Sequence, residues 1–296
     1  MAADATITVS RTDEGHSVSR LSASALVGPA TLIVVLGLLI PIFILLRYSL
    51  DRYTPGALLV EAVTAENYVK FVSDPYYRAV LFTTVRVSFI CTLACLVIGF
   101  PLAYALARTE SRFKNLLIML IVLPMFVGNA VRAAGWMTLF GTKGMLNTTL
   151  ISLGIIAHPL EIMFTETAVI VGLIAVNLPV MVLTLQSVIE GIGRFTEEAA
   201  LSLGAGPWTT FWRVLWPLAQ PGIITGTILT FILAVNAYAT PVLLGGPKFM
   251  MMAPLVYNEF QLGNWPFGAA ASFILMATTL VLTGATNYWM QRRYRR

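Results

Sequence analysis

The chain of 296 residues is 57% hydrophobic and only 11% charged, and its formal net charge is +5. Because soluble globular domains contain about 25% charged residues, this composition excludes a soluble domain and indicates an integral membrane protein. Basic residues accumulate in the cytoplasmic loops of membrane proteins, so we interpret the positive charge as a topology signal and predict no nucleic-acid partner.

The first 78 residues predict a tail, one membrane helix and a loop. Residues 1–25 are polar and rich in Ala, Ser and Thr, which predicts a disordered cytoplasmic tail. Residues 26–46 carry no charge over 21 positions, enough to cross a bilayer core of about 30 Å, and no clear signal-peptide cleavage site follows them. Residues 26–78 are therefore expected to hold a retained first transmembrane helix and a periplasmic loop.

The rest of the chain predicts five more transmembrane helices. They are expected at residues 79–107, 115–140, 167–189, 221–244 and 267–290. Pro179 is expected to kink the fourth helix of the chain. Residues 79–290 should form one bundle, with the first helix apart from it, and residues 291–296 form a basic cytoplasmic tail. The predicted fold class is all-α, a polytopic membrane protein with six transmembrane helices.

The distribution of Lys and Arg predicts the orientation of these helices. Six crossings place both termini on one side, together with the turn after the second helix and the loop before the fifth. That side carries most of the basic residues, namely Arg11, Arg20, Arg108, Arg112, Lys114, Arg194, Arg213, Arg292, Arg293, Arg295 and Arg296. The opposite loops carry Arg52, Lys70, Arg78, Lys143 and Lys248. The positive-inside rule therefore places both termini in the cytoplasm.

A polar segment at residues 196–217 separates the fourth and fifth helices. Thr196 is expected to cap a short helix whose first turn contains Glu197 and Glu198, where acidic groups complement the helix dipole. Gly204 suits the left-handed position that ends such a helix. The segment is expected to continue as a second, amphipathic helix that starts at Pro207 and ends at Pro217.

Two interpretations of this second helix follow from its residues. A rigid exposed helix can dock into a socket on a soluble partner. Alternatively, Trp208, Trp212 and Trp216 can anchor it in the lipid headgroup region. The residues alone favour neither interpretation.

The chain has no signature of catalysis. It lacks a G-x-x-x-x-G-K-[ST] phosphate loop, and its two histidines have no plausible nucleophile and acid partners. Cys91 and Cys95 lie four positions apart without a neighbouring His or carboxylate, so we interpret them as packing residues and predict no metal site. Catalysis is therefore absent or is supplied by a separate ATPase, and no cofactor is predicted in this chain.

Two arginines fall within predicted helices, where a central charge costs about 2.5–3.5 kcal/mol. Arg86 lies close enough to its helix start to extend to the outer interface, and we favour that interpretation. Arg132 follows Asn129 by one turn and is either a pathway group or a structural one. The candidates for a translocation path are Asn129, Arg132, Asn177, Asn236 and Tyr238, of which the last three are equally candidates for interhelical hydrogen bonds.

Residues 198–217 read EAALSLGAGPWTTFWRVLWP. This segment resembles the EAA loop of permease subunits of binding-protein-dependent ABC importers, in Glu198, Ala199, Ala200, Gly204, Ala205 and Pro217. The resemblance implies that the loop at 196–217, including Glu197, contacts a separate subunit that binds and hydrolyses ATP. The predicted topology places the loop on the cytoplasmic side, where ATP is.

The stretch LAVNAYATPVLLGGPKFMMMAPLVYNEF, followed by NWPFGAA, resembles permeases of the spermidine/putrescine branch. The resemblance covers residues 79–290 and implies a MetI-like bundle in the lipid of a bacterial inner membrane. It also implies ABC ATP-binding subunits, a second permease subunit, identical or different, and an extracytoplasmic solute-binding protein. The implied cargo is a small solute, such as a polyamine, an opine or a related amine or amino-acid-like compound.

Other functional classes fit the residues less well. A secondary transporter driven by an ion gradient usually has ionisable residues near the membrane midplane and often has repeats, whereas the predicted helices show no central carboxylate and no repeat. A membrane scaffold that only recruits an ATPase would leave Arg132 without a role. A polycationic solute is expected near acids or aromatic cages, and the predicted helices contain no clear Asp or Glu.

Overall fold

The computed structural model describes residues 20–54 and 60–294. The chain divides into two units, one ending at Arg47 and one beginning at Tyr48. Apart from an isolated β-bridge between Arg52 and Val60, the regular elements of the described residues are helices, which confirms the all-α prediction. Most of the predicted N-terminal tail, residues 1–19, lies outside the described residues, as do residues 295–296 of the C-terminal tail.

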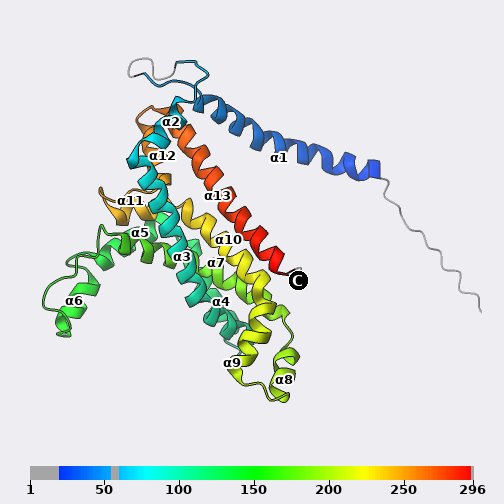
Figure 1. The fold of residues 1–296 in the computed structure, drawn as a ribbon. Coiled ribbons are helices and arrows are strands. Elements are labelled where there is room, and N and C mark those ends of the chain that lie inside the picture. The colour runs from blue at the N-terminus through cyan, green and yellow to red at the C-terminus, as the bar shows by residue number, and fades with distance from the viewer. Residues whose placement is uncertain (1–19, 55–59, 295–296) are drawn as a thin grey trace, which may run out of the picture. The chain divides into compact units, whose positions relative to one another are not determined.

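Figure 1 labels the main helices along the chain. Those of the described residues are α1 (Arg20–Ser49), α2 (Glu66–Ser73), α3 (Pro75–Arg108), α4 (Lys114–Val122), η1 (Leu123–Phe126), α5 (Asn129–Phe140), α6 (Met145–Ser152), α7 (Glu166–Gly191), α8 (Arg194–Ser202), α9 (Pro207–Thr210), η2 (Phe211–Leu215), α10 (Trp216–Val235), α11 (Ala239–Gly245), α12 (Met252–Gln261) and α13 (Trp265–Tyr294).

Five helical stretches in the described part of the chain are long and apolar enough to cross a membrane. They are Thr31–Ser49, Pro75–Arg108, Glu166–Gly191, Pro207–Val235 and Trp265–Tyr288. A sixth candidate is a bent pair, Lys114–Phe126 with Asn129–Ser152. The six predicted spans therefore have counterparts in the structure, provided that the bent pair is counted as one span. The first helix is longer than predicted, because α1 already begins at Arg20.

The third helix was predicted as one element over residues 115–140, and this prediction is wrong. α4 passes into the 3₁₀ turn η1, and the backbone is extended at Val127 (φ −85°, ψ 127°) before α5 begins at Asn129. Pro124 has no N–H with which to continue the helical hydrogen bonds, and the two halves are bent by 97°. Irregular backbone at membrane depth is tolerated only where it is buried in protein or lines a cavity.

The separation of residues 207–217 from a helix at 221–244 is also wrong. α9, the π-helical turn η2 and α10 form one candidate span, Pro207–Val235, which passes through both Pro217 and Pro221. A proline ring clashes with the carbonyl four residues earlier, and the wider π turn directly before α10 gives Pro217 the necessary room. The span stops at Val235, and residues 236–238 separate it from α11.

The main hydrophobic core lies among α3, α7 and α10. Cys91 and Cys95 are fully buried in it and have free thiols. α7 continues through Pro179 without a break in the helix. Close contact between α7 and α10 depends on Gly222, because a Cβ added there would lie 2.8 Å from the Cβ of Val188. Small residues of this kind allow the backbones of membrane helices to approach each other.

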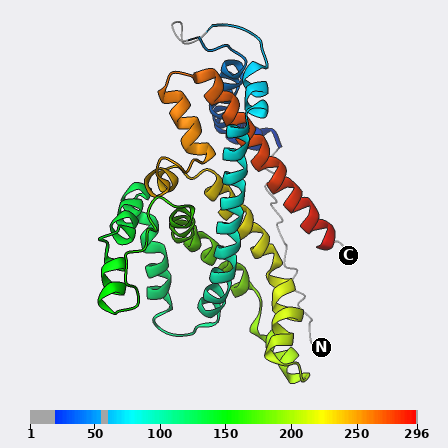
Figure 2. The same cartoon turned by 60° about the vertical axis from the view of Figure 1, so that its left-hand side comes forward.

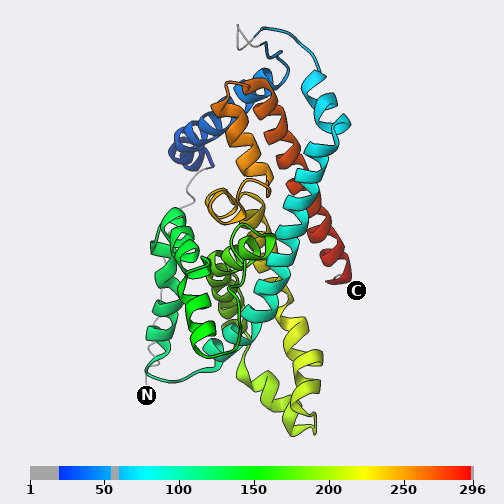
Figure 3. The ribbon, with the colours of Figure 1, turned by 90° about the vertical axis from the view of Figure 1, so that its left-hand side faces the viewer.

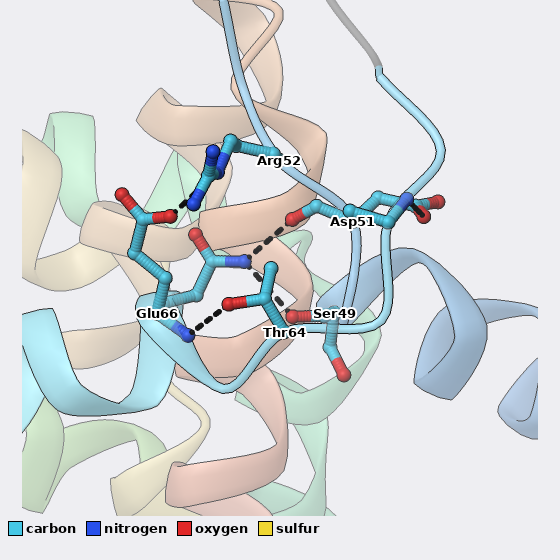
Figure 4. Close-up of polar contacts among 7 residues, drawn as sticks. Ser49, Asp51, Arg52, Thr64 and Glu66 are labelled. Atoms are coloured by element: carbon cyan, nitrogen blue, oxygen red, sulfur yellow. Dashed lines mark hydrogen bonds and ion pairs between the residues drawn. The ribbon is translucent and has the colours of Figure 1, made fainter.

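Residues 49–52 are held at the start of α2 by polar contacts, which Figure 4 shows. The Asn67 side-chain amide donates to the carbonyls of Ser49 (2.9 Å) and Asp51 (2.8 Å). Arg52 Nε lies 2.7 Å from Glu66 Oε2. These bonds join residues 49–52 to α2, so these residues of the predicted periplasmic loop have a defined structure.

The second unit has two clearly different ends. In Figures 1, 2 and 3, α2 and α12 lie at one end of this unit, α8 and α9 lie at the other, and α3 lies between them. The loop at 196–217 is therefore at the end opposite the loop that precedes α2. This separation is what the charge distribution predicted for two loops on opposite faces of a membrane.

Candidate functional site

The segment at 196–217 begins with α8, a short helix that starts earlier than predicted. Its N-cap is Gly193 and not Thr196. The Gly193 carbonyl already accepts a hydrogen bond from the Thr196 amide at 3.1 Å, so Thr196 lies within the first turn and cannot cap it. Of the two glutamates predicted in the first turn, only Glu197 lies there, where its charge is favourable for the helix dipole; Glu198 follows it, because the helix starts earlier than predicted.

The turn after α8 has the geometry that its glycine predicted. Gly204 has a φ of +86°. Its amide donates to the Leu201 carbonyl at 2.9 Å, and the Ala205 amide donates to the Ala200 carbonyl at 3.1 Å. This pair of bonds is the Schellman motif. Pro207 then begins α9 at a position where its missing N–H is not needed.

The surface of α8 and the following turn is exposed and partly apolar. Phe195 is 83% exposed, Leu203 is 88% exposed and Trp208 is 73% exposed. Glu198 and Ala199 are also exposed on this short helix, whereas Ala200 and Ala205 are half-buried. Single exposed apolar residues are common, but a group at one end of the molecule marks an interaction site.

Phe211 of η2 and Trp216 at the start of α10 pack against α3. Their rings lie 5.4 Å and 5.5 Å from the ring of Phe100, measured between ring centroids. Trp212 lies 5.2 Å from Trp216 with the two rings tilted by 49°, and it is exposed. One of the three tryptophans considered as lipid anchors, Trp216, is therefore half-buried against α3, which fixes the start of α10 on the bundle.

Glu197 and Glu198 face different surroundings, although they are neighbours. The Glu197 carboxylate forms an ion pair with Arg108, the last residue of α3. Its other oxygen accepts a hydrogen bond from the Tyr104 hydroxyl at 2.9 Å. The carboxylate of Glu197 is thus occupied within the chain, whereas Glu198 is exposed.

A separate cavity of about 200 Å³ lies among α5, α7 and the segment after α10. Its polar lining includes Asn129 and Arg132 from α5, Asn177 from α7, and Tyr238 and Thr240 from the segment after α10. The structure therefore brings together four of the five residues predicted for a path. Both breaks in the membrane-spanning helices, before α5 and after α10, contribute to this cavity.

Arg132 is the only charged residue in the lining of this cavity as the structure describes it. One guanidinium nitrogen, Nη2, donates to the Asn129 side-chain oxygen. The other two, Nε and Nη1, are buried without a hydrogen-bond partner. Buried polar groups are normally paired, so these two donors are an exception within the described structure.

Asn177 and Asn236 also form hydrogen bonds within their own helices or line a second cavity. Asn177 is buried and donates to the Leu173 carbonyl at 2.9 Å. Asn236, at the end of α10, lines a neighbouring cavity of about 560 Å³ together with Tyr238 and Tyr257. The two tyrosine rings lie 4.7 Å apart between centroids, so Tyr238 is shared by both cavities.

Arg86 has an acidic partner that was not predicted. It forms an ion pair with Glu166, in the first turn of α7, and both side chains are partly exposed. The pair lies where α7 begins, so the Arg86 charge is neutralised near the end of the span and does not reach the Arg132 cavity. No group of three His, Cys, Asp or Glu residues that could hold a metal ion occurs among the described residues.

Tyr104 and Arg108 are the site residues that sequence reasoning missed. From the sequence, Arg108 was identified only as one of the basic residues that predict the orientation in the membrane. The available signal is their spacing: residues four apart share one helix face, so a Tyr and an Arg at the end of α3 were positioned to bind one carboxylate. Their partner lies 89 positions away from Arg108, which the sequence does not show.

Comparison with known proteins identifies related chains. The family described as binding-protein-dependent transport system inner membrane component matches residues 95–296. The spermidine/putrescine transport system permease protein PotB of Haemophilus influenzae is 36% identical over 86% of this chain and 90% of that protein. PotB of Escherichia coli K12 is 38% identical over 78% of this chain and 83% of that protein. A probable sulfate transport system permease protein, cysT of Nephroselmis olivacea, is 30% identical over 81% and 84% of the two chains.

Solved structures of low sequence identity share the fold. A chain of a bacterial alginate ABC transporter, in complex with an alginate pentasaccharide-bound periplasmic protein, superimposes with a TM-score of 0.77 at 16% identity, over 91% of this chain and 94% of that one. A chain of the MetNI methionine ABC transporter superimposes with a TM-score of 0.52 at 19% identity, over 75% and 98% of the two chains. At these identities the likeness extends to the fold alone.

Proposed function

The chain belongs to the binding-protein-dependent transport system inner membrane components, the permease subunits of ABC importers, and on this premise we propose how it docks its ATPase, which solute it carries and how it lies in the membrane. Family membership makes it a multi-pass inner-membrane protein that works with a solute-binding protein and with a subunit that hydrolyses ATP. We take residues 79–290 as the permease domain. A second permease subunit, identical or different, completes the pathway in this proposal.

The proposed ATPase-docking surface is α8 with the turn that follows it. The observation that supports this most directly is the exposure of Phe195, Glu198 and Leu203 on a short helix at one end of the bundle. Apolar side chains beside one charge suit a socket on a soluble partner. The positive-inside rule assigns this end, and with it both termini, to the cytoplasm, where ATP-binding subunits reside.

Purification of the tagged protein from native membranes in mild detergent tests the docking surface. We expect an ATP-binding subunit to co-purify with the wild type and to be lost with Glu198→Lys, because the exposed carboxylate would become a like charge for any basic socket. Glu161→Lys is the matched control, since Glu161 is also exposed but precedes α7 in a different loop. Wild-type protein that purifies alone, and takes up solute under an ion gradient without ATP, would instead establish a secondary transporter.

The proposed solute class is a small amine. Support comes from the relatives at 36% and 38% identity, which are permeases of spermidine/putrescine transport systems. The tyrosine pair Tyr238 and Tyr257 adds a physical argument, because aromatic faces attract ammonium groups. In this proposal the two tyrosine rings attract the cation in the cavity of about 560 Å³, whose described lining contains no carboxylate.

A second solute class is favoured by one specific observation. Arg132 lines a cavity that has no acidic lining residue in the described structure, and two of its buried donors have no partner. A guanidinium in this state suits a carboxylate, so a solute that carries both an amine and a carboxylate, such as an opine, fits both the tyrosines and the arginine. Competition in binding-protein-dependent uptake of labelled spermidine distinguishes the two classes. Reduced uptake with unlabelled putrescine supports a small amine, and reduced uptake with an amino-acid conjugate supports a solute that carries both groups.

A further inference from the structure

The end of α3 is joined to α7 and α8 by one arginine. Arg108 closes α3, and its guanidinium forms the ion pair with Glu197 in the first turn of α8. The other terminal nitrogen, Nη1, donates to the carbonyls of Ile189 (3.2 Å) and Ile192 (3.0 Å) at the end of α7. A single side chain therefore contacts two other helices at the end of the bundle that carries the docking surface.

The contacts of Arg108 lie at the end of α7 and at α8. The carbonyls at the end of α7 form the negative end of the helix dipole; the Ile189 carbonyl also accepts from the Ile192 amide at 3.1 Å, and Arg108 adds a second bond there. The Glu197 carboxylate is shared between Arg108 and the Tyr104 hydroxyl. In addition, the backbone carbonyl of Arg108 accepts a hydrogen bond from Arg194 of α8 at 2.6 Å. The joint therefore holds α8 at both the side chain and the backbone of Arg108.

Burial distinguishes this joint from the other ion pairs nearby. The Arg108 and Glu197 side chains are each 15% exposed, whereas in the neighbouring pair Arg194 is 41% exposed and Glu110 is 80% exposed. Exposed pairs are screened by water and contribute little. A largely buried pair that also makes hydrogen bonds holds its geometry, because separating it leaves an uncompensated charge.

We propose that Arg108, Glu197 and Tyr104 form the joint through which movement of α8 is transmitted to α3 and α7, so that Glu197 is a positioning residue and does not contact the ATPase. This inference rests on the docking role proposed for α8. When the partner moves α8, the joint carries α3 and α7 with it, while the Gly204 turn and the π turn η2 lead the same motion into α10. These three helices form the main core and reach the Arg132 cavity through α7 and the segment after α10.

Glu197→Gln in the assembled transporter tests the joint. The variant keeps the side-chain volume and loses the charge, and we expect it to co-purify with the ATP-binding subunit as the wild type does. Uptake should fall about tenfold, which is the size of effect typical of residues that act as one unit. The rate of ATP hydrolysis should stay unchanged, so more ATP is consumed for each solute molecule transported. Arg108→Gln should do the same, and the double variant should be no worse than either single variant.

Glu110→Gln is the matched control, because it is the same substitution in the exposed pair of the same region, and its uptake should stay within about twofold of wild type. Loss of the ATP-binding subunit in Glu197→Gln would overturn the proposal and make Glu197 a docking contact. Unchanged uptake per ATP, or additive effects in the double variant, would overturn it as well. A wild-type protein that retains no ATP-binding subunit would overturn the proposed docking function itself, and the joint with it.

Discussion

Gly204 has a backbone conformation that side chains other than Gly rarely adopt. Its φ is +86°, and nothing lies within 4 Å of the position that a Cβ would occupy. A substitution there is therefore strained by the backbone alone, without any steric clash. Left-handed conformation costs L-residues about 1–2 kcal/mol, and β-branched residues tolerate it least.

Gly204→Val should accordingly reduce ATP-dependent uptake about fivefold or more, the effect of roughly 1 kcal/mol or more on the turn, while the amount of protein in the membrane stays unchanged. Uptake and membrane content in the same cells provide the measurement. Gly206→Val is the matched control, because Gly206 also has open space and a φ of −73° that valine adopts readily. Equal losses in the two variants would show that bulk and not backbone conformation matters here.

Arg132 carries a charge whose guanidinium leaves two buried donors without a partner within the described residues. Replacing a buried, incompletely paired charge by an apolar residue of similar volume is often neutral or stabilising. We therefore expect Arg132→Met to leave the thermal midpoint of the purified complex unchanged or higher, while uptake falls about tenfold or more because the solute loses its hydrogen-bond donors. A lower midpoint with normal uptake would make Arg132 a structural residue.

Arg86→Met is the comparison for this experiment. Arg86 already has Glu166 as a partner, and the pair is partly exposed. Its removal should cost only about 0.2–1 kcal/mol of stability and should leave uptake intact. Opposite patterns for the two arginines would thus separate a charge that acts on the solute from a charge that supports the fold.

At the scale of elements, the contact between α7 and α10 depends on the absence of a side chain at Gly222. An added methyl group would meet Val188 at 2.8 Å, closer than real Cβ contacts. Inserting a methyl group into a well-packed interface costs about 1–3 kcal/mol. Gly222→Ala should therefore lower the thermal midpoint of the detergent-purified protein, and Val188→Ala in the same chain should restore most of it. A double variant as unstable as the single one would indicate that the strain lies elsewhere.

The helix breaks show where element prediction failed. Pro124 and Pro217 both follow helical segments, and a proline alone does not show whether the helix ends or continues through it. In the structure the first accompanies a break with a 97° bend, whereas the second is absorbed by a π turn inside a continuous helix. Which outcome occurs depends on what packs around the turn. At Pro217 the preceding residue, Trp216, packs against the ring of Phe100 in α3.

At the scale of the whole molecule, the orientation in the membrane follows from charge and is open to direct measurement. Ser73, at the end of α2, and Ser202, at the end of α8, are both exposed and lie at opposite ends of the second unit. A membrane-impermeant maleimide should label Ser73→Cys in intact cells whose outer membrane is permeable to the reagent. It should label Ser202→Cys only after the inner membrane is opened.

The native cysteines do not interfere with this labelling, because Cys91 and Cys95 are both fully buried. The unsubstituted protein is the control and should remain unlabelled in both conditions. Labelling of Ser202→Cys from outside would reverse the proposed topology and place α8 away from any ATP-binding subunit.

By itself the sequence determined the features that are encoded locally. The uncharged length of its segments indicated the spans, the balance of Lys and Arg predicted an orientation, and Gly204 with Pro207 predicted the turn that the structure contains. Each depends on residues within a few positions of one another, or on a property summed over a segment. The resemblance at 198–217 indicated the family for the same reason, since its pattern is contiguous.

Only the tertiary structure decided what depends on residues that are distant in the chain. It gathered Asn129, Arg132, Asn177 and Tyr238 around one cavity, and it turned Glu197 inward to Arg108 while its neighbour Glu198 stayed exposed. Two adjacent glutamates have the same local propensities, so their different surroundings arise from the packing of α8 against α3 and α7. The physical reason is that burial and pairing are properties of the assembled bundle, which no single segment contains.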